Sequence, residues 1–382
     1  MNRSIVDVAI VGAGPAGLAV AACLKRQGRS FVLLERQGNV GSAWRTHYDR
    51  LHLHTDKAHS SLPHYKLPSH YPRYPSRQQV VDYLEAYARY FDLRPHFNEE
   101  VRDARRMGDV WDITTSQGRH QARTLVVAAG YNNQPNIPQW PGQDRYKGTI
   151  LHSKQYRNAA VFKDQNVLVV GLGNSGGELL IDLWEHGARP SIAVRSPVNV
   201  IPREVLGTPF LTMGILQSWL PSRLADALNA PVTKLIIGDL RPYGLRQPAE
   251  GPITQIREQG RVPFIDVGTI RLIKDGHVKV HPNIERFTEH GVVFTDGQQR
   301  DFQAVVLATG FKPAVDRWLH AGASAMDAQG TPASSGQPVP GQHLYFCGYH
   351  ISPTGMLREI AREALAISKS IGQSVKDKLR QA

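Results

Sequence analysis

The sequence predicts an α/β fold in which one domain is inserted into a second, similar domain. A short apolar strand, a glycine-rich turn and a helix follow one another near the N-terminus, and the same order returns near residue 166. Each copy is followed by a segment that alternates apolar and polar residues and then by another apolar strand. We therefore expect two Rossmann-like, three-layer ββα domains, each with a small antiparallel meander.

The composition is that of an ordinary globular protein. The chain has 382 residues, 41% hydrophobic and 20% charged, which is enough to bury a core without disulfides or metals. No apolar run approaches the ~18 residues of a membrane span, and the N-terminus runs directly into a strand, so we expect no integral membrane association and a cytoplasmic location. The net charge is +12, but no basic cluster is interleaved with aromatic residues, so we expect no nucleic-acid partner.

The first copy begins with the apolar run at residues 6–11, which is typical of a buried parallel strand. The turn Gly12-Ala13-Gly14-Pro15-Ala16-Gly17 follows, and a helix is expected over 18–27 because Gly28 ends it. The second strand is expected at 31–34, with Glu35 at its end.

The second copy has the same plan. A strand is expected at 167–170, followed by the turn Gly171-Leu172-Gly173-Asn174-Ser175-Gly176 and a helix through 179–186 that Gly187 ends. The next strand, at 192–194, leads to Arg195 and Ser196. The third turn glycine and the glycine that ends the helix are equally far apart in both copies, which favours an internal duplication.

The segments after each copy predict the meanders and the domain boundaries. Alternation at 101–115 and 120–123 precedes an apolar strand at 125–130, and alternation at 269–280 and 292–302 precedes one at 305–310. A proline-rich connector at 135–142 marks the passage between domains. The first domain is expected to be discontinuous, comprising 1–155 and 306–382, and the second to comprise 156–305 with a helical insertion at about 203–250.

The two turns predict two binding sites for dinucleotides. In each, the first glycine permits a tight turn, the second lets the backbone approach a diphosphate, and the third permits close packing of helix and strand. The diphosphate then binds the free N–H groups at the positive end of the helix. The carboxylate of Glu35 suits a ribose diol and repels a 2′-phosphate, whereas Arg195 suits a 2′-phosphate. These residues predict FAD at the first site and NADPH at the second.

Several motifs resemble those of the class B flavin-dependent monooxygenases, and most closely the YUCCA-like flavin-containing monooxygenases. The segment 146–156 is similar to the family fingerprint FxGxxxHxxxY, with Tyr146 in the Phe position and Tyr156 in place of the Trp of Baeyer–Villiger enzymes. The ATG motif is matched at 308–310, and further likeness lies at 48–54, 74–79, 243–245 and 263–268. The Asn-bearing loop by which animal-type members hold NADP is not evident after His54.

The resemblance implies an NADPH- and O2-dependent monooxygenase acting through a C4a-(hydro)peroxyflavin on a small organic substrate. YUCCA-like members would carry out oxidative decarboxylation of an aryl 2-oxo acid such as indole-3-pyruvate, and the alternative is N- or S-oxygenation of an amine or sulfide. Outside this class, a flavin reductase that passes electrons to a partner, or a redox-sensing binding module, is also considered. Cys23 and Cys347 form no CxxC pair, so no protein dithiol is expected to accept the electrons.

The residues and the resemblance together select the candidate contacts. The expected FAD contacts are Gly12, Gly14, Pro15, Ala16, Gly17, Glu35, Arg36, Ala43, Trp44, His54, Val101 and Gly348. The expected NADP contacts are Gly171, Gly173, Asn174, Ser175, Gly176, Arg195, Ser196 and Thr309.

No catalytic residue is certain, because the flavin carries the chemistry. His152 is either a residue that tunes cofactor movement or a hydrogen-bonded linker residue. Lys57 either faces the flavin or substrate, or is a solvated lysine. The histidines between His47 and His70 lack the spacing of metal ligands, so no metal site is expected. The apolar segment 210–240 is interpreted as a lid over a substrate tunnel, a helical hairpin packed on the core or the contact of a possible homodimer, with a membrane-surface helix as a weaker option.

Overall fold

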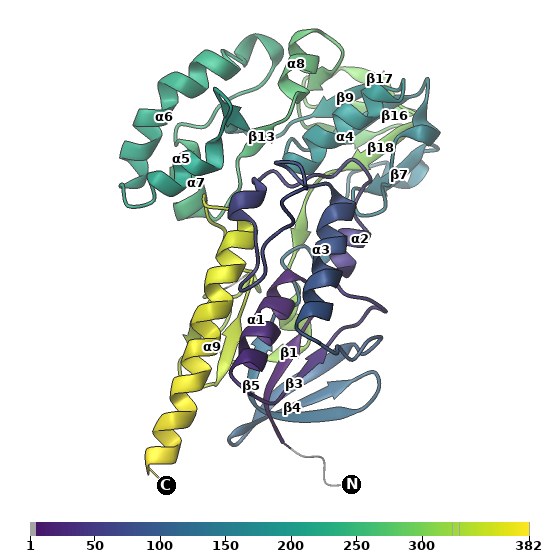
Figure 1. Cartoon of the computed structure of the whole chain (residues 1–382). Coiled ribbons are helices and arrows are strands. Elements are labelled where there is room, and N and C mark those ends of the chain that lie inside the picture. Colours follow the sequence, from purple (N-terminus) through teal and green to yellow (C-terminus); the bar gives the residue numbers. More distant parts are fainter. Residues whose placement is uncertain (1–4, 323, 328, 382) are drawn as a thin grey trace.

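The computed structural model describes residues 5–322, 324–327 and 329–381, and it consists of two lobes (Figure 1). The first lobe is the lower part of Figure 1, with α1, α3 and α9 beside the sheet that contains β1 and β5. The second lobe is the upper part, with the sheet that contains β8 and β9, and with the helices α5, α6 and α7 at one side. Within the described residues, no helix is both long enough and apolar enough to cross a membrane.

The first lobe is built on a sheet that has eight strands in the described part of the chain, with the order β2-β1-β5-β4-β3-β20, with β22 paired to β5 and β21 paired to β22. Its strands are β1 (Val6–Val11), β2 (Phe31–Leu34), β3 (Val101–Met107), β4 (Val110–Thr115), β5 (Arg119–Val127), β20 (Leu319–His320), β21 (Pro338–Val339) and β22 (Leu344–Phe346). Strands β2, β1, β5 and β22 are parallel, whereas β3, β4 and β5 form an antiparallel meander. The predicted meander is confirmed, with the difference that β5 is one strand continuous with the parallel part.

Helices cover one face of this sheet: α1 (Pro15–Arg26), α2 (Ser42–Arg45), α3 (Arg77–Tyr90) and α9 (Met356–Gln381), with the short 3-10 turn η1 (Lys57–His59) before α3. The other face is also apolar, and Val315 of the 3-10 turn η5 (Val315–Arg317) packs in the core on that side. A capping box between Ser76 and Gln79 begins α3. Leu18 and Leu24 of α1 pack with Ile10 of β1 and Ile367 of α9 in one buried cluster, which fixes α1 at the end of β1.

The second lobe is built on a parallel sheet with the order β14-β9-β8-β18-β7. Its strands are β7 (Thr149–His152), β8 (Asn166–Val170), β9 (Arg189–Ala193), β14 (Lys279–His281) and β18 (Ala304–Leu307). The antiparallel meander beside it comprises β15 (Ile284–Phe287), β16 (Gly291–Phe294) and β17 (Gln299–Asp301), and the helices α4 (Asn174–Glu185) and α8 (Thr269–Lys274) and the turn η3 (Ala160–Phe162) complete this part. The predicted α/β class with parallel sheets is confirmed.

The prediction that 269–280 begins the second meander was wrong. This segment forms the helix α8 and then β14, which is parallel to β9 in the main sheet. The carboxylate of Asp266 accepts the N–H groups of Gly268 and Ile270, which stabilises the start of the helix. Because Ile270 and Ile273 are three residues apart, they fall on one buried face of this helix.

A helical segment extends from the second sheet between β10 (Val200–Pro202) and β13 (Phe264–Asp266), which pair in parallel. It contains the hairpin β11 (Glu204–Val205) and β12 (Thr208–Pro209), the helices α5 (Phe210–Leu216), α6 (Ser222–Ile237) and α7 (Pro252–Gln259), and the turn η4 (Arg241–Tyr243). The insertion therefore extends beyond the predicted end at about 250. This segment exposes several large apolar side chains, among them Leu216 of α5, Leu235 of α6 and Trp219 in the turn between these helices.

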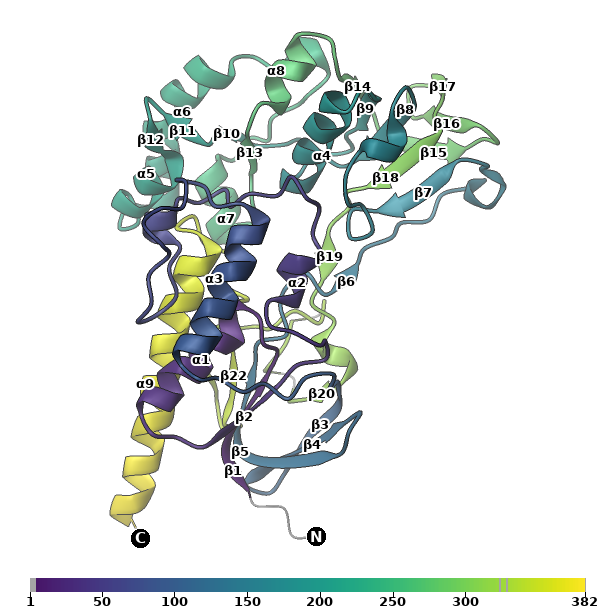
Figure 2. The ribbon, with the colours of Figure 1, turned by 45° about the vertical axis from the view of Figure 1, so that its right-hand side comes forward.

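The chain crosses between the lobes twice, and the two crossings are paired. Strand β6 (Gln134–Pro135) pairs with β19 (Phe311–Lys312) in an antiparallel ladder, and η2 (Gln143–Arg145) follows β6. Figure 2 shows β6 and β19 side by side between the lobes. Strand β7 pairs with β18 in the second sheet. The sheets therefore change before Thr149 and after Leu307, whereas the sequence predicted boundaries at 155/156 and 305/306.

Candidate cofactor-binding site

The two glycine-rich turns have the same backbone conformation. Gly12 follows β1 with a φ of +105°, and Gly171 follows β8 with a φ of +102°. A Cβ atom on Gly12 would lie 2.5 Å from the carbonyl oxygen of Ala128, and one on Gly171 would lie 2.8 Å from that of Ala308. Both positions therefore require glycine, because the left-handed conformation and the neighbouring backbone exclude a side chain.

The third glycine of each turn allows the helix to pack against the turn itself. A Cβ atom on Gly17 would lie 1.8 Å from the carbonyl oxygen of Gly12, and one on Gly176 would lie 2.1 Å from that of Gly171. The first turn of α1 and that of α4 are thus in direct contact with the backbone that precedes them. This packing fixes the position of each helix N-terminus.

The second glycine of each turn faces open space. A Cβ atom on Gly14 or Gly173 would meet no protein atom within 4 Å. Both residues are the N-caps of their helices, α1 and α4, and neither receives a side-chain cap. The N–H groups of the following helical turns are therefore available to an anion at the positive end of each helix. This geometry fits a diphosphate at each turn.

The residue after the second strand differs between the two turns. The carboxylate of Glu35 is 7% exposed, and it accepts the N–H of Ala13 at 2.8 Å and that of Gln37 at 2.9 Å. Glu35 is thus held at the first turn as an acceptor. Arg195 is exposed and follows the end of β9, where the carbonyl of Ala193 accepts the N–H of Gly171 in the second turn. Arg36, the neighbour of Glu35, is exposed as well.

A second arginine lies next to Arg195, and the sequence analysis missed it. The guanidinium of Arg246 donates to the carbonyl of Arg195 at 3.2 Å, while the N–H of Val198 donates to the carbonyl of Arg246 at 2.8 Å. Arg246 follows the segment 243–245, which carries part of the family likeness, but nothing in its spacing links it to β9. The guanidinium of Arg246 therefore lies against the backbone of Arg195, shortly after the end of β9.

The segment 44–57 runs from the first lobe onto the second. Trp44 packs against the core of the first lobe, whereas the buried Tyr48 belongs to the core of the second and hydrogen-bonds Ser175. His54 pairs with Glu178 of α4. Glu178 is buried, and its second carboxylate oxygen has no hydrogen-bond partner among the described residues. The sequence missed Glu178, because an acidic residue in a helix ordinarily faces solvent.

Asn174 and Thr309 use their side chains for contacts within the protein. The amide oxygen of Asn174 accepts the N–H of Ile265 at 2.8 Å, which ties α4 to β13. The hydroxyl of Thr309 donates to the carbonyl of Asn136 at 2.5 Å. Their backbones still border the second turn and the crossing, respectively. Ser175 and Ser196, the two predicted hydroxyl contacts, are partly buried.

His152 is a neutral residue at the junction of the lobes. Its Nδ1 accepts the N–H of Lys154 at 3.1 Å, so its Nε2 donates to the carbonyl of Gly310 at 3.1 Å. Burial lowers the pKa of His152 below its usual value, and the ring packs edge-on against Phe311. Both ring nitrogens are therefore used in hydrogen bonds within the protein, and the predicted influence on cofactor movement stays a prediction.

Lys57 is used by the loop that follows it. Its ammonium donates to the carbonyls of Ser69 and Tyr71, which closes the segment 57–71. This arrangement favours a structural role over the predicted contact with flavin or substrate.

Among the other predicted FAD contacts, Gly348 lies beside the first turn. A Cβ atom on Gly348 would lie 3.2 Å from that of Ala16, and its N–H donates to the carboxylate of Glu363 at 2.6 Å. Burial raises the pKa of Glu363, a residue of α9 that the sequence analysis did not select. Val101 is buried at the start of β3, and Ala43 is exposed in α2.

Comparison with known proteins identifies the family. The model of the pyridine nucleotide-disulphide oxidoreductase family matches residues 9–203. The indole-3-pyruvate monooxygenase YUCCA6 of Arabidopsis thaliana is 43% identical over 81% of this chain and 77% of its own length. The indole-3-pyruvate monooxygenase YUCCA4 of Oryza sativa subsp. japonica is 41% identical over 90% of this chain and 84% of its own length. The chain belongs to the YUCCA family of monooxygenases.

Solved structures agree with this YUCCA membership at the level of the fold. A flavin-containing monooxygenase from Stenotrophomonas maltophilia superposes with a TM-score of 0.74 at 22% identity, covering 98% of this chain and 100% of that one. Cyclohexanone monooxygenase from Rhodococcus sp. Phi1, bound to NADP+, superposes with a TM-score of 0.75 at 18% identity, covering 98% and 85%. As a YUCCA-family protein, the chain is an oxidoreductase of the monooxygenase type that uses FAD and NADPH.

Proposed function

We propose that this protein catalyses the NADPH- and O2-dependent oxidative decarboxylation of an aryl 2-oxo acid such as indole-3-pyruvate. The observation that carries the proposal is the pair of matching diphosphate cradles, one bordered by a buried carboxylate and the other by two arginines. Support for the substrate class comes from the names of the relatives that are about 40% identical over most of the chain. When bound, the flavin accepts hydride from NADPH and activates dioxygen.

The first lobe is the proposed FAD-binding domain. The diphosphate would bind the N–H groups at the start of α1, because Gly14 leaves that space open. The ribose hydroxyls would donate to Glu35, whose carboxylate is already positioned by Ala13 and Gln37. A buried and pre-positioned acceptor favours a cofactor that stays bound through many turnovers.

The second lobe is the proposed NADPH-binding domain. The diphosphate would bind at the start of α4, beyond Gly173, and the 2′-phosphate would bind Arg195 with help from Arg246. Because Arg195 is exposed, the site is suited to a nucleotide that binds and leaves in each catalytic cycle.

The helical segment is proposed to cover the substrate site. A Cβ atom on Gly214 of α5 would lie 3.0 Å from the carbonyl oxygen of Pro353, just before α9. A Cβ atom on Gly355 would lie 3.0 Å from the Thr55 methyl group and 3.4 Å from Leu211 of α5. Leu211 thus lies over the start of α9 and the segment 44–57, where it would exclude water from the reacting centre.

Coupled turnover measurements test the proposal. The purified protein would be assayed for NADPH oxidation, O2 uptake, hydrogen peroxide release and product with indole-3-pyruvate, and in parallel with methyl aryl sulfides. We expect one NADPH and one O2 consumed for each arylacetic acid and CO2 formed, with little peroxide. Coupled sulfoxide formation without decarboxylation would replace the proposed reaction by heteroatom oxygenation. Uncoupled oxidation with every substrate, together with reduction of an added electron carrier, would favour a flavin reductase instead.

A further inference from the structure

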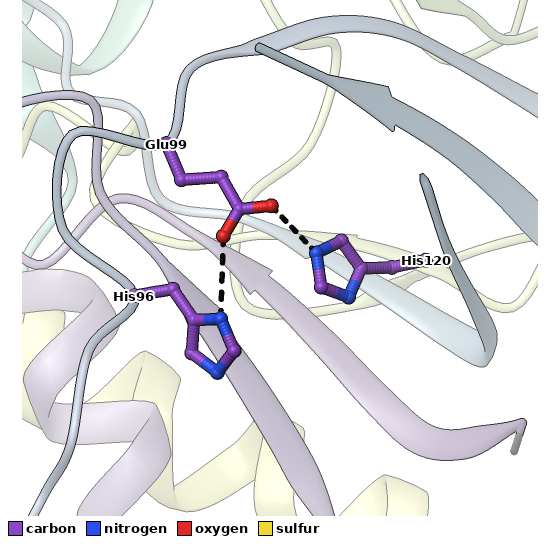
Figure 3. A group of neighbouring side chains, drawn as sticks. All are labelled: His96, Glu99 and His120. Carbon is purple, nitrogen blue, oxygen red and sulfur yellow. Dashed lines mark hydrogen bonds and ion pairs between the residues drawn. The ribbon is translucent and has the colours of Figure 1, made fainter. Parts of the chain in front are cut away.

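Two histidines and a buried glutamate converge in the first lobe (Figure 3). His96 and Glu99 lie in the loop between α3 and β3, and His120 lies in β5. The Nδ1 atom of His96 is 3.2 Å from one carboxylate oxygen of Glu99, and the Nε2 atom of His120 is 2.7 Å from the other. One ligand atom from each residue lies within 4.8 Å of the other two.

The donor set is that of a zinc-type site. Imidazole nitrogens and a carboxylate oxygen bind Zn2+ at about 2.0–2.2 Å, which places neighbouring ligand atoms of a tetrahedron about 3.3 Å apart. The observed separations around Glu99 are close to this value, so small rotations of the side chains would admit an ion. The side chain of Glu99 is 5% exposed and that of His120 is 21% exposed, whereas that of His96 is 52% exposed. The site is thus anchored inside and open to water on one side.

A further contact orients the carboxylate. The hydroxyl of Thr115 donates to Glu99 at 2.7 Å, on the oxygen that also faces His120. Ligating carboxylates in metal sites are held by such outer hydrogen bonds. Thr115 and His120 flank the β4–β5 turn, so the meander and the preceding loop supply the site together.

We propose that His96, Glu99 and His120 bind a divalent transition-metal ion of the zinc type, with water as the fourth ligand. The sequence analysis expected no metal site, because it searched for ligands at the short spacings of metal-binding motifs. Here the third ligand comes from a separate strand, and only the fold brings it to the other two.

The site is joined to the end of β2 that carries Glu35. The N–H of Glu35 donates to the carbonyl of His96 at 2.9 Å, and the N–H of Glu99 donates to the carbonyl of Glu35 at 2.9 Å. The N–H of His96 donates to Leu33 at 2.7 Å. A bound ion would hold this loop against β2 and thereby stabilise the position of the Glu35 carboxylate. This coupling rests on the proposed binding of FAD at Glu35, whereas the metal site itself does not.

Metal titration of the untagged full-length protein tests the site. Chelator-treated protein would be titrated with Zn2+ in competition with a chromophoric chelator, and with Co2+ to record its visible spectrum. We expect one equivalent of Zn2+ and the intense absorption of Co2+ in a site of low coordination number. Stoichiometric binding that survives in the double variant His96→Ala/His120→Ala would overturn the assignment, as would wild-type binding no tighter than that of the double variant.

Single variants separate ligation from folding. Loss of an outer hydrogen bond alone costs about 10- to 100-fold in metal affinity, so His120→Ala should cost at least about 100-fold. Glu99→Gln keeps the size of the side chain and should have a similar effect. His290→Ala is the matched control, because this exposed histidine lies in the second lobe. An equal loss of affinity in the control would also refute the site.

The rate of FAD release tests the coupling. Release from the metal-loaded protein should be slower than from the chelated protein by about fivefold or more, the lower end of typical coupling between sites. Glu99→Gln should abolish the difference. Equal rates with and without stoichiometric metal would exclude the coupling, and a protein that binds Zn2+ but never FAD would refute the proposed function while leaving the metal site in place.

Discussion

The two glycine-rich turns have nearly the same backbone, yet their surroundings differ. Gly12 and Gly171 have matching φ angles, and Gly14 and Gly173 both face open space. At the first turn, a buried carboxylate is held by two N–H groups, whereas at the second the exposed Arg195 has the guanidinium of Arg246 bonded to its backbone carbonyl. The backbone of each turn therefore forms a site that fits a diphosphate, and we expect the side chain after the next strand to determine which nucleotide binds there.

The largest expected effect comes from the third glycines, because there the two turns should fail in the same way. Gly17→Ala and Gly176→Ala each place a methyl group about 2 Å from a backbone carbonyl, at 1.8 and 2.1 Å. Overpacking typically costs about 1–3 kcal/mol, and because the clashing atom in each case is a backbone carbonyl oxygen, both variants should lose about 3 kcal/mol or more. Thermal unfolding and soluble yield measure this. Gly38→Ala is the control, since Gly38 has no positive φ and a Cβ atom there would lie 3.5 Å from the nearest atom, Oδ1 of the Asn98 side chain. Loss of stability in the control alone would contradict the packing account.

The middle glycines should separate the two turns. Gly14→Ala and Gly173→Ala add a methyl group to open space, so the unfolding temperature of the cofactor-free protein should stay nearly unchanged. The methyl group would instead collide with a diphosphate, at a cost of about 1–3 kcal/mol, or about 5- to 150-fold in affinity. We expect Gly14→Ala to lose FAD, measured by flavin absorbance, and Gly173→Ala to keep FAD but bind NADPH weakly. The reverse pattern would exchange the two assignments.

Arg195→Ala should sharpen the contrast by acting on one nucleotide. Charge-assisted hydrogen bonds contribute about 1.5–3 kcal/mol, so KM for NADPH should rise about 10- to 100-fold while KM for NADH changes little. Arg246→Ala should show the same preference with a smaller effect. Arg223→Ala, an exposed residue of α6, is the control. Equal rises for both nucleotides would contradict the role in binding the 2′-phosphate.

The smallest expected effect concerns His47, in the segment 44–57 that runs from the first lobe onto the second. Burial, with the charges of Arg77 and Arg157, lowers the pKa of His47 from 6.5 to about 4. Between these values the unfolded chain binds a proton that the folded protein does not, so stability falls as the pH drops from about 6.5 to about 4. His47→Gln should flatten this decline by about 1 kcal/mol or less, since solvent screens a partly exposed group. Urea unfolding at several pH values measures it, and an unchanged slope would contradict the burial of a neutral ring.

Features that depend on neighbouring residues could be predicted from the sequence. Both turns, the helices after them and the strands before them follow from apolar runs and glycines a few residues apart. The prediction for the segment 269–280 was wrong because its apolar residues fit both an alternating and a helical period. The carboxylate of Asp266 accepts the N–H of Ile270 and thereby favours the helix. Strand β7 was placed in the first domain because its four residues lie within the fingerprint at 146–156, whose end was taken as the boundary.

Features that depend on distant contacts could not be predicted. In the sequence, Glu178 looks like any acidic residue of a helix. Its partner His54 comes from the segment 44–57, which packs on α4 only in the folded protein. Arg246 reaches Arg195 only because the chain returns from α6 to the end of β9. His96 and His120 share one carboxylate through strand pairing that no short motif records. Each of these contacts joins elements whose relative positions only the complete fold determines.

The paired crossings restrict how the two lobes move. Because β6 and β19 are hydrogen-bonded to each other, and Thr309 and Asn136 are bonded beside them, the connection has two adjacent chains instead of one. Such a connection permits the lobes to rotate about an axis through the β6–β19 ladder. A twist of one lobe that pulls the two strands apart would break their hydrogen bonds and is therefore opposed. An opening of the lobes would therefore follow one arc, and each closure would bring the second turn back to the same position relative to the first.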